Sequence, residues 1–593
     1  EERAARVLDP AKLPLLREQL WTAVRRAALD DDLDLRIAED QRSFDLFLAR
    51  LEGYLDELQR ATIRDGLHVL GQAPTGTARE HLLDALLHLA PEAERGADSH
   101  LRAQVGGQLD RTGDEMAAVL EALGGGYVPA GPSGSPSRGM WNVLPTGRNF
   151  YSVDPQAIPS PAAWQTGRRL ATALLERHLK DTGRYPQTVG LVVWGTATMR
   201  THGDDVAQAL ALLGVRPLWQ PQTGRVTAVE PVPLAELGRP RIDVTLHISG
   251  MFRDAFPHLV ALLDGAVQIV ASLDEPAPDN FVAAHVRAEA DRLREHGVDA
   301  PAATRRASLR LFGSKPGCYG AGLLPLIEQR NWRSPADLAQ AYESWSSYAY
   351  GQDVPGRAER GAFRARFAAI DVAVKNQDNR EHDLFDSDDY FQYHGGMVAT
   401  AQALRSAAPD TDDTVPDGDP RSPVLRAYFG DSADPDRPMV RSLAEEARRV
   451  FRSRAINPQW IAAMRRHGYK GAMELAATVD YLFGYDATTG VVADWMYQGL
   501  AESYVFDLQQ QDFFHHSNPW ALRDITARLL EAASRGMWQE PAPHTLQRLR
   551  QVYLGVEGDL EAGSSATASL DAGAVATGAA PLVTARGVAE GRR

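Results

Sequence analysis

The sequence predicts a multidomain α/β protein in which a Rossmann-like parallel α/β core is preceded and followed by helical regions. Two continuous apolar runs in the middle of the chain, each followed by an amphipathic stretch, are typical of buried parallel strands joined by helices. Apolar residues spaced three and four apart near both ends indicate helices. At 593 residues, the chain is too long for one hydrophobic core, so we expect about three or four domains.

The first region, residues 1–123, is predicted to be helical. Its clearest helix has apolar residues at the helical spacing, namely Phe44, Phe47, Leu48, Leu51, Leu55 and Leu58. Two further helices are expected at 78–89 and 114–123. Residues 124–139 are rich in glycine, proline and serine, and this composition predicts a flexible linker.

The second region, residues 140–300, is predicted to be the Rossmann-like domain. Its elements alternate along the chain: helix 161–181, strand 188–195, helix 204–214, strand 241–250 and helix 256–273. This alternation predicts right-handed crossovers and a parallel sheet. Ligands of such sheets bind at the carboxyl ends of the strands. The loops 195–203 and 249–254 therefore form a candidate site.

The remaining chain is predicted to contain three regions. Residues 301–440 are expected to be irregular α+β, with a helix at 336–351 and a polar surface loop at 409–423. Residues 441–561 show helical periodicity. Residues 562–593 are mostly small and low in complexity, which predicts a disordered tail.

The composition limits the class and the location of the protein. Its 63 Lys+Arg and 78 Asp+Glu give a net charge of −15, which argues against nucleic-acid or membrane partners and is compatible with cation handling. No apolar run approaches the ~20 residues that span a bilayer, and the start EERAARVLDP has no signal-peptide core. Because Cys318 is the only cysteine, we expect no disulfide framework, no thiolate cluster and a cytoplasmic protein. A start on charged residues without Met leads us to expect a fragment or processed piece.

Several common catalytic motifs are absent from the sequence. It contains no GxxxxGK[ST], and therefore no ordinary P-loop for the phosphates of ATP. The glycine-rich stretch 313–322, which includes Lys315, lacks the P-loop spacing and is interpreted as a tight loop. HExxH, CxxC and GxSxG are also missing, which removes common zinc and serine-hydrolase templates.

Residues 374–397, VKNQDNREHDLFDSDDYFQYHGGM, form an acidic–aromatic segment. Its possible metal ligands are Glu381, His382, Asp383, Asp386, Asp388, Asp389 and His394, and its aromatic side chains are Phe385, Tyr390, Phe391 and Tyr393. Carboxylates with imidazole suit a divalent cation, and aromatic faces suit a flat apolar ligand. The alternative is a solvated acidic loop that its aromatic residues anchor to the body.

Each candidate functional residue outside this segment can also be interpreted as a purely structural residue. Arg148 can clamp a carboxylate, with Asn149 beside it, or can fix a loop through Asp154. His202 lies on a loop at a strand end, whereas Asp204 is more typical of a helix N-cap. Arg253 and Asp254, after the second strand, have the same ambiguity. Glu57 and His68 flank a helix end and are either functional or partly buried structural residues.

Several long blocks resemble one family. GLVVWGTATMRTHGDDVAQALALLGVRP, GRPRIDVTLHISGMFRDAFP and the acidic–aromatic segment are similar to the large subunits of aerobic cobaltochelatase (CobN) and, more loosely, to the porphyrin-binding large subunits of magnesium chelatase. The resemblance extends from Asp45 to Glu561. The large subunits of this family are longer, and the chain resembles their C-terminal half. The YHGG end of the acidic–aromatic segment favours the cobalt branch, as does its mixture of His and Asp, which fits Co(II) better than Mg(II).

The resemblance implies ATP-dependent insertion of Co(II) into hydrogenobyrinic acid a,c-diamide during aerobic cobalamin biosynthesis. It also implies an AAA+ ATPase subunit and a second small chelatase subunit as partners. ATP and Mg(II) would be used by these partners, in agreement with the missing P-loop. The alternatives are magnesium insertion into protoporphyrin IX, a non-catalytic tetrapyrrole carrier, and an unrelated enzyme with a permanent metal ion.

Metal insertion requires cobalt to lose water, the ring to lose N–H protons and the macrocycle to be held in place. The expected site lies mainly in region 301–440, and its residues fall into three groups. Candidates for proton removal are Glu57, His68 and His202. Candidates for binding the macrocycle are Arg148, Asn149, Trp194, Arg253, Lys315, Tyr390, Phe391 and Tyr393. Candidates for weak, transient metal binding are His394, Asp388, Asp389, Glu381 and His382.

Overall fold

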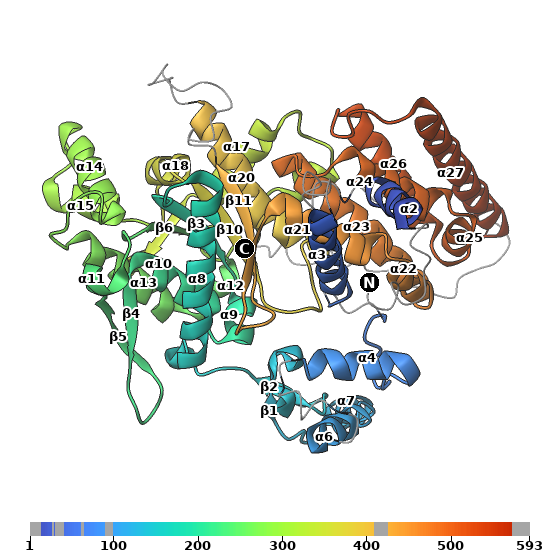
Figure 1. Ribbon diagram of the computed structural model, residues 1–593, viewed down its shortest axis with the longest axis horizontal. Coiled ribbons are helices and arrows are strands. Elements are labelled where there is room, and N and C mark those ends of the chain that lie inside the picture. Colours follow the sequence, from blue (N-terminus) through green and yellow to red (C-terminus); the bar gives the residue numbers. More distant parts are fainter. Residues whose placement is uncertain are drawn as a thin grey trace.

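An eight-stranded sheet forms the centre of the protein (Figure 1). The computed structural model describes residues 13–26, 29, 41–60, 65–88, 90, 96, 99–407 and 425–571. The sheet has the strand order β12-β11-β10-β3-β6-β7-β8-β9. In chain order its strands are β3 (Thr188–Val193), β6 (Asp243–Ile248), β7 (Leu311–Gly313), β8 (Tyr348–Gly351), β9 (Val354–Ala358), β10 (Val372–Gln377), β11 (Arg426–Asp431) and β12 (Met439–Ser442).

The middle of the sheet is parallel, which confirms the predicted α/β class. Strands β11, β10, β3, β6 and β7 run parallel to one another. The two strands predicted from apolar runs, β3 and β6, pair along their whole length. The sheet as a whole is mixed, because β12, β8 and β9 pair antiparallel. It also continues to Ser442, past the predicted boundary at residue 300, through short strands that lack a long apolar run.

Alternating residues of the central strands face two different helical layers. Val189, Leu191 and Val193 of β3 belong to one core cluster, whereas Val192 belongs to another. The period of two is that of an extended strand. The first cluster contains α8 (Pro161–Thr182), α10 (Asp204–Leu213) and α13 (Pro257–Ala271), and the second contains α17 (Pro335–Ser346), α18 (Arg360–Ala368) and α20 (Gly396–Ser406). Both faces of the sheet are therefore buried.

The helices predicted in the α/β region are confirmed, with one correction. The expected helix 336–351 ends at Ser346, and Tyr348–Gly351 forms β8. Tyr350 packs into the core of the sheet there, so tertiary pairing overrides the helical pattern. The other elements of this region are α9 (Gly195–Thr201), β4 (Val215–Trp219), β5 (Val226–Pro231), α11 (Leu234–Leu237), α12 (Gly250–Ala255), α14 (Phe281–Glu295), α15 (Ala300–Ala307), α16 (Leu324–Glu328), α19 (Asp388–Tyr390) and the π-helix η6 (Phe391–Gly395).

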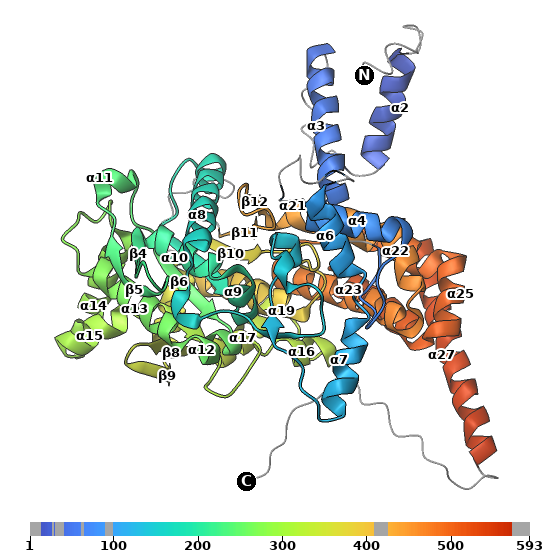
Figure 2. The same cartoon turned by 90° about the horizontal axis from the view of Figure 1, so that it is seen from below.

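The N-terminal region is helical, as predicted. Its elements are α2 (Leu13–Arg26), α3 (Gln41–Arg60), α4 (Gly76–Leu86), α6 (His100–Leu109), α7 (Asp114–Leu123), β1 (Gly131–Pro132), η3 (Pro136–Arg138), η4 (Trp141–Val143), β2 (Asn149–Tyr151) and η5 (Pro155–Ala157). The predicted flexible linker thus contains β1 and the 3₁₀-helix η3. Figure 2 shows α2 and α3 side by side, projecting from the body, and Trp21 stacks on Phe47 between them with ring centroids 4.8 Å apart.

The C-terminal region forms a helical layer beside the sheet, drawn in orange to red in Figure 1. It consists of α21 (Leu443–Val450), η7 (Phe451–Ala455), α22 (Pro458–Arg465), α23 (Gly468–Thr489), α24 (Asp494–Leu500), η8 (Ala501–Phe506), α25 (Leu508–Ser517), α26 (Pro519–Ser534) and α27 (Pro543–Asp571). Helix α27 continues beyond residue 562, where the tail was predicted to begin. Residues 572–593 of that tail and the predicted loop 409–423 lie outside the described residues. Within the described ranges, no helix combines the length and apolarity needed to cross a membrane.

A buried ion pair joins the C-terminal layer to the acidic–aromatic segment. Arg454 of η7 donates to both carboxylate oxygens of Asp383, at 2.6 and 2.8 Å. Both side chains are almost completely buried. Arg454 also donates to Thr478 at 3.0 Å and lies over the ring of Trp460. The pair therefore fixes two layers that the sequence separates by 71 positions.

Breaking this pair should be strongly destabilising. We expect Arg454→Met to lower the free energy of unfolding by ~3–5 kcal/mol, because it leaves the Asp383 carboxylate buried without a counter-charge. The control is Arg216→Met, which removes the half-exposed pair with Glu230 and should cost less than ~1 kcal/mol. Urea unfolding monitored by circular dichroism measures both variants. Equal midpoints for the two variants would show that the buried pair contributes little.

A buried histidine should make stability depend on pH. His247 of β6 is fully buried, with Nδ1 2.6 Å from the hydroxyl of Tyr342, and burial lowers its pKa to about 3. Between that value and the unfolded pKa of ~6.5, the unfolded chain binds a proton that the folded chain does not, so stability falls as pH falls. This group should cost ~2 kcal/mol between about pH 7.5 and about pH 5.

The variant His247→Asn tests this dependence, because its amide can replace Nδ1 but does not titrate. We expect the loss of stability between the two pH values to be smaller in the variant than in the unmodified chain. Denaturant unfolding at both pH values gives the comparison independently of the absolute stability of the variant. An unchanged pH dependence would mean that His247 is not responsible.

Candidate functional site

The segments 195–203 and 249–254, predicted as the loops of a site, lie at the carboxyl edge of the parallel strands, but they form mainly the short helices α9 and α12 and do not line the cavity at the ends of β10 and β11. Helix α9 begins directly after β3, and α12 begins directly after β6. The backbone N–H of Gly195 donates to Ser249 Oγ at 3.2 Å, which joins the two loops. A Cβ added at Gly195 would lie 2.8 Å from the backbone of Met251, so only glycine allows this approach. The segments that follow β10 and β11 lie at the same carboxyl edge of the sheet, because these strands run parallel to β3 and β6.

A cavity of about 540 Å³ lies at the ends of β10 and β11. One wall follows β10 and includes Gln377, Asn379 and His382. A second wall follows β11 and includes Asp431 and Ala433. The cavity is completed by residues of α3, by residues of β12 and α21, and by His88. Segments from the N-terminal, α/β and C-terminal regions therefore enclose one space.

The cavity is lined by charges of both signs. Its carboxylates are Asp56, Glu57, Asp383, Asp431 and Asp434, its arginines are Arg380, Arg437, Arg441 and Arg449, and its histidines are His88 and His382. Arg441 donates to Glu57 and, at 3.2 Å, to Asp431. Burial alone would raise the pKa of Asp431, but Arg441 and Arg449 hold it below its usual value. Such a lining suits a ligand that carries carboxylates, or a cation, or both.

The acidic–aromatic segment divides into an exposed part and a buried part. Glu381 and His382 are exposed, and His382 Nδ1 lies 3.4 Å from Asp386. A hydrogen bond with Asp386 raises the pKa of His382 above its ordinary value. The aromatic residues of the segment are buried. The aromatic residues thus anchor the segment to the body, whereas part of its polar stretch lines the cavity.

The predicted metal ligands are not brought together. His394 is fully buried, with Nε2 3.3 Å from the carbonyl of Ala373, and burial lowers its pKa to about 4. Asp388 accepts from Gln392 at 2.7 Å. Asp389 is exposed, yet the protein around its carboxylate and the charge of Asp388 raise its pKa to about 6. In the part of the chain that the structure describes, no three His, Cys, Asp or Glu residues are arranged to hold a metal ion.

The predicted proton acceptors lie in three different places. Glu57 lines the cavity. His68 is exposed and lies 3.0 Å from the buried carboxylate of Glu115 in the N-terminal region. His202 ends α9 with a φ of 57°, and its buried Nε2 has no hydrogen-bond partner. Burial lowers the pKa of His202. Asp204, expected as an N-cap, is instead the first residue of α10 after Gly203.

The predicted ring-stacking residues pack on one another. Trp194 contacts Tyr390 and Tyr393 edge-on, with ring centroids 4.8 and 6.0 Å away. Tyr390 donates its hydroxyl proton to Gln377 of the cavity wall. Phe391 lies against Gly484 in the core, where a Cβ would clash with its ring. These side chains support the carboxyl edge from inside.

Of the predicted macrocycle clamps, Arg253 and Asn149 have protein partners. Arg253 donates to both oxygens of Asp254 and to the carbonyl of Lys315 at 3.0 Å, while Lys315 itself is exposed. The amide of Asn149 donates to the carbonyls of Pro132 and Val143 at 2.6 and 2.8 Å. Arg148 lines a separate cavity of about 530 Å³ beside α7, and its buried Nε has no hydrogen-bond partner.

A buried polar network beside the cavity escaped the sequence interpretation. Lys375 of β10 lies with Nζ 4.3 Å from the ring centroid of Trp194, and Arg200 holds both oxygens of Asp378 at 2.9 Å. Asn376 donates to Asp205 at 2.7 Å. The sequence signal was available, because β10 places charged and amide residues in an otherwise apolar strand. Buried charge of this kind requires partners.

Comparison with known proteins gives consistent matches. Residues 1–107 and 90–545 match the family model described as CobN/Magnesium Chelatase. The aerobic cobaltochelatase subunit CobN of Pseudomonas aeruginosa is 42% identical over 93% of this chain and 49% of its own length. The chloroplastic magnesium-chelatase subunit ChlH of Oryza sativa subsp. japonica is 36% identical over 76% of this chain and 31% of its own length.

A solved structure shares the fold. The catalytic subunit of cobaltochelatase from Mycobacterium tuberculosis superposes with a TM-score of 0.84 at 49% sequence identity, covering 94% of this chain and 50% of that one. The chain thus spans about half the length of the cobaltochelatase relatives that it matches. Since the family model covers most of the chain, the protein belongs to the CobN/magnesium chelatase family.

Proposed function

We propose that this chain is the tetrapyrrole-binding, metal-inserting part of an ATP-dependent cobaltochelatase. The reaction is insertion of Co(II) into hydrogenobyrinic acid a,c-diamide, in aerobic cobalamin biosynthesis. The observation that carries the proposal is the cavity at the carboxyl edge, whose lining combines carboxylates, histidines and arginines. The 42% identity to a protein named as a CobN subunit supports cobalt over magnesium.

The charges of the cavity match the two substrates. Hydrated Co(II) is attracted by carboxylates such as Glu57 and Asp431, and histidine beside carboxylate suits this borderline cation. The acidic side chains of the macrocycle suit arginines such as Arg437, whose side chain is largely exposed. Glu57 and Asp431 are only partly exposed, and both are already bound by Arg441, so they would hold the metal weakly and the macrocycle could take it.

His382 is the histidine that we propose for proton removal from the ring nitrogens. It lines the cavity and is exposed to it. The neighbouring carboxylate of Asp386 raises its pKa, which makes it a better proton acceptor. His68 and His202 do not line this cavity, so we do not assign proton removal to them.

Partner subunits supply the energy in this proposal. The sequence contains no GxxxxGK[ST] motif, so ATP and Mg(II) are used by an AAA+ ATPase subunit acting with a second small chelatase subunit. Removing water from hydrated cobalt and deforming the ring both cost free energy. Nucleotide hydrolysis on a partner subunit can supply this free energy through a conformational change. This chain provides the binding surface and the proton acceptor.

A spectroscopic titration tests the function. The chain is mixed with hydrogenobyrinic acid a,c-diamide or protoporphyrin IX and with Co(II) or Mg(II), with and without the partner subunits and ATP. We expect the metallated spectrum only for the corrin precursor with Co(II), partners and ATP. Binding without metallation would indicate a carrier, metallation of protoporphyrin by Mg(II) would indicate the magnesium branch, and stoichiometric metal in the purified chain would indicate a permanent metal site.

The role of His382 has a matched control in the same chain. His382→Asn should lower the rate of cobalt insertion at least ~10-fold, because a general base contributes ~10²–10⁴ in rate, while tetrapyrrole affinity changes less than ~2-fold. His516 lies 3.2 Å from Asp512 with the same four-residue spacing on an exposed helix, and His516→Asn should change neither quantity. A His382→Asn enzyme with the rate of this control would remove His382 from the mechanism.

A further inference from the structure

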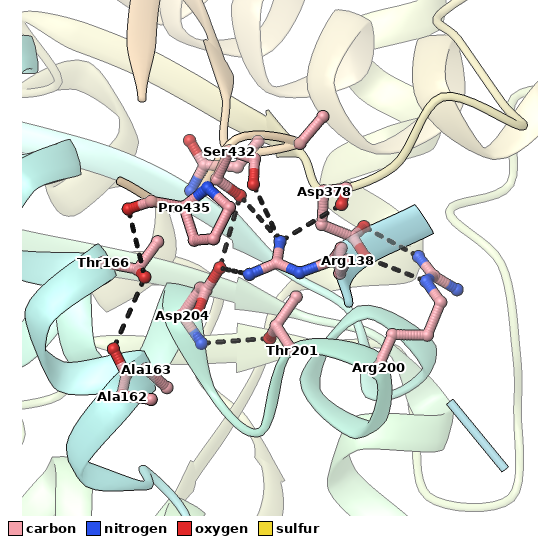
Figure 3. A network of polar contacts seen from close by, with 12 residues as sticks. Arg138, Ala162, Ala163, Thr166, Arg200, Thr201, Asp204, Asp378, Ser432 and Pro435 are labelled. Carbon is pink, nitrogen blue, oxygen red and sulfur yellow. Dashed lines mark hydrogen bonds and ion pairs between the residues drawn. The ribbon is translucent and has the colours of Figure 1, made fainter. Parts of the chain in front are cut away.

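We infer that Arg138 is a positioning residue that holds the two walls of the cavity together. This inference rests on the proposed function and identifies a residue outside the cavity lining that sets its shape. Arg138 ends η3, within the segment predicted to be a flexible linker. Figure 3 shows its guanidinium between the segments that follow β10 and β11 and the start of α10.

The guanidinium of Arg138 makes four polar contacts. Nη1 donates to the carbonyl oxygens of Asp378 and Ser432 at 3.1 and 2.9 Å, and lies 3.3 Å from Ser432 Oγ. Nη2 donates to Asp204 Oδ2 at 2.9 Å. The side chains of Arg138 and Asp204 are 8% and 2% exposed, so water competes little for these contacts. The Arg138 guanidinium therefore binds three segments that are distant in the sequence, at Asp204, Asp378 and Ser432.

The position of these contacts explains why they matter for the cavity. The last backbone bond between β10 and β11 is donated by the N–H of Ser432 to the carbonyl of Gln377. Beyond it the two segments separate to form the cavity walls, with Asn379 on one side and Ala433 on the other. Arg138 binds the carbonyls of the two residues at this point of separation. It thus fixes the distance between the walls where the strand pairing ends.

The neighbouring charges make the guanidinium hard to replace. Asp378 already uses its carboxylate to bind Arg200, so only its carbonyl is offered to Arg138. Burial raises the pKa of Asp204 to about 7, and Arg138 supplies the opposing positive charge. A lysine can neutralise Asp204, but a single ammonium lacks the planar fork that reaches the carboxylate and two carbonyls together.

Arg138 also connects the N-terminal region to the site. The segment that carries it is held by the amide of Asn149, which donates to Pro132 and Val143. At its other side, the N-terminal region contacts the C-terminal layer, where the N–H of Leu67 donates to His467 at 2.9 Å. A displacement of the N-terminal region relative to the sheet would therefore pull on the cavity walls through Arg138.

The test compares Arg138→Met and Arg138→Lys with Arg169→Met. Arg169 contacts the same loop, at Pro435 and Asp436, but is half exposed and outside the cavity. Hydrogen exchange of residues 378–383 and 431–434 is measured together with KM for the tetrapyrrole and kcat for cobalt insertion. We expect Arg138→Met to speed exchange in both segments and to raise KM at least ~10-fold, with kcat changed less than ~3-fold.

Arg138→Lys separates positioning from simple stabilisation. Lysine keeps the positive charge opposite Asp204, so the variant should have an unfolding midpoint close to that of the unmodified chain. Its KM should nevertheless stay raised, and hydrogen exchange in the two segments should stay fast. The inference is overturned if both Arg138 variants match Arg169→Met in exchange and KM, or if Arg138→Lys restores both. If the unmodified chain inserts no cobalt, the proposed function fails, and the exchange measurement alone decides the role of Arg138.

Discussion

Buried charges must be paired, and the pairs at the carboxyl edge of the sheet hold its separate layers in place. Arg454 pairs with Asp383, Arg200 pairs with Asp378, and Arg138 pairs with Asp204. Each partner comes from a different part of the chain, so the folded arrangement of layers is required before any of these charges can be buried. Removing one member leaves the other in a medium that solvates it poorly.

This constraint also explains the character of the cavity. On one wall, Arg441 helps to hold the pKa of Asp431 below its usual value. The aromatic residues that the sequence offered as ring contacts are buried behind the walls instead. The result is a charged surface backed by buried aromatic residues. In the proposed function, such a surface attracts a metal ion without trapping it, as a transfer reaction requires.

The sequence was most informative where local pattern decides structure. Continuous apolar runs identified β3 and β6, and helical spacing identified α8, α10 and α13, because burial on the two faces of a parallel sheet imposes those patterns. The site was harder to predict. The sequence pointed to the acidic–aromatic segment, part of which lines the cavity, but its spacing could not show that His394 is buried in the core while His382 lines the cavity. Glu57 meets Arg441 across 384 positions, and such a contact leaves no local signal.

Glu57 lies on α3. Helix α3 projects from the body together with α2 and is largely separate from the sheet (Figure 2). The remaining walls are built on strand ends and on the C-terminal helices. The cavity therefore has one wall from α3, where Glu57 pairs with Arg441 and Arg449, and its other walls come mainly from the sheet and the C-terminal layer. A substitution on the α3 wall would change the charge of the cavity without altering any residue of the sheet core.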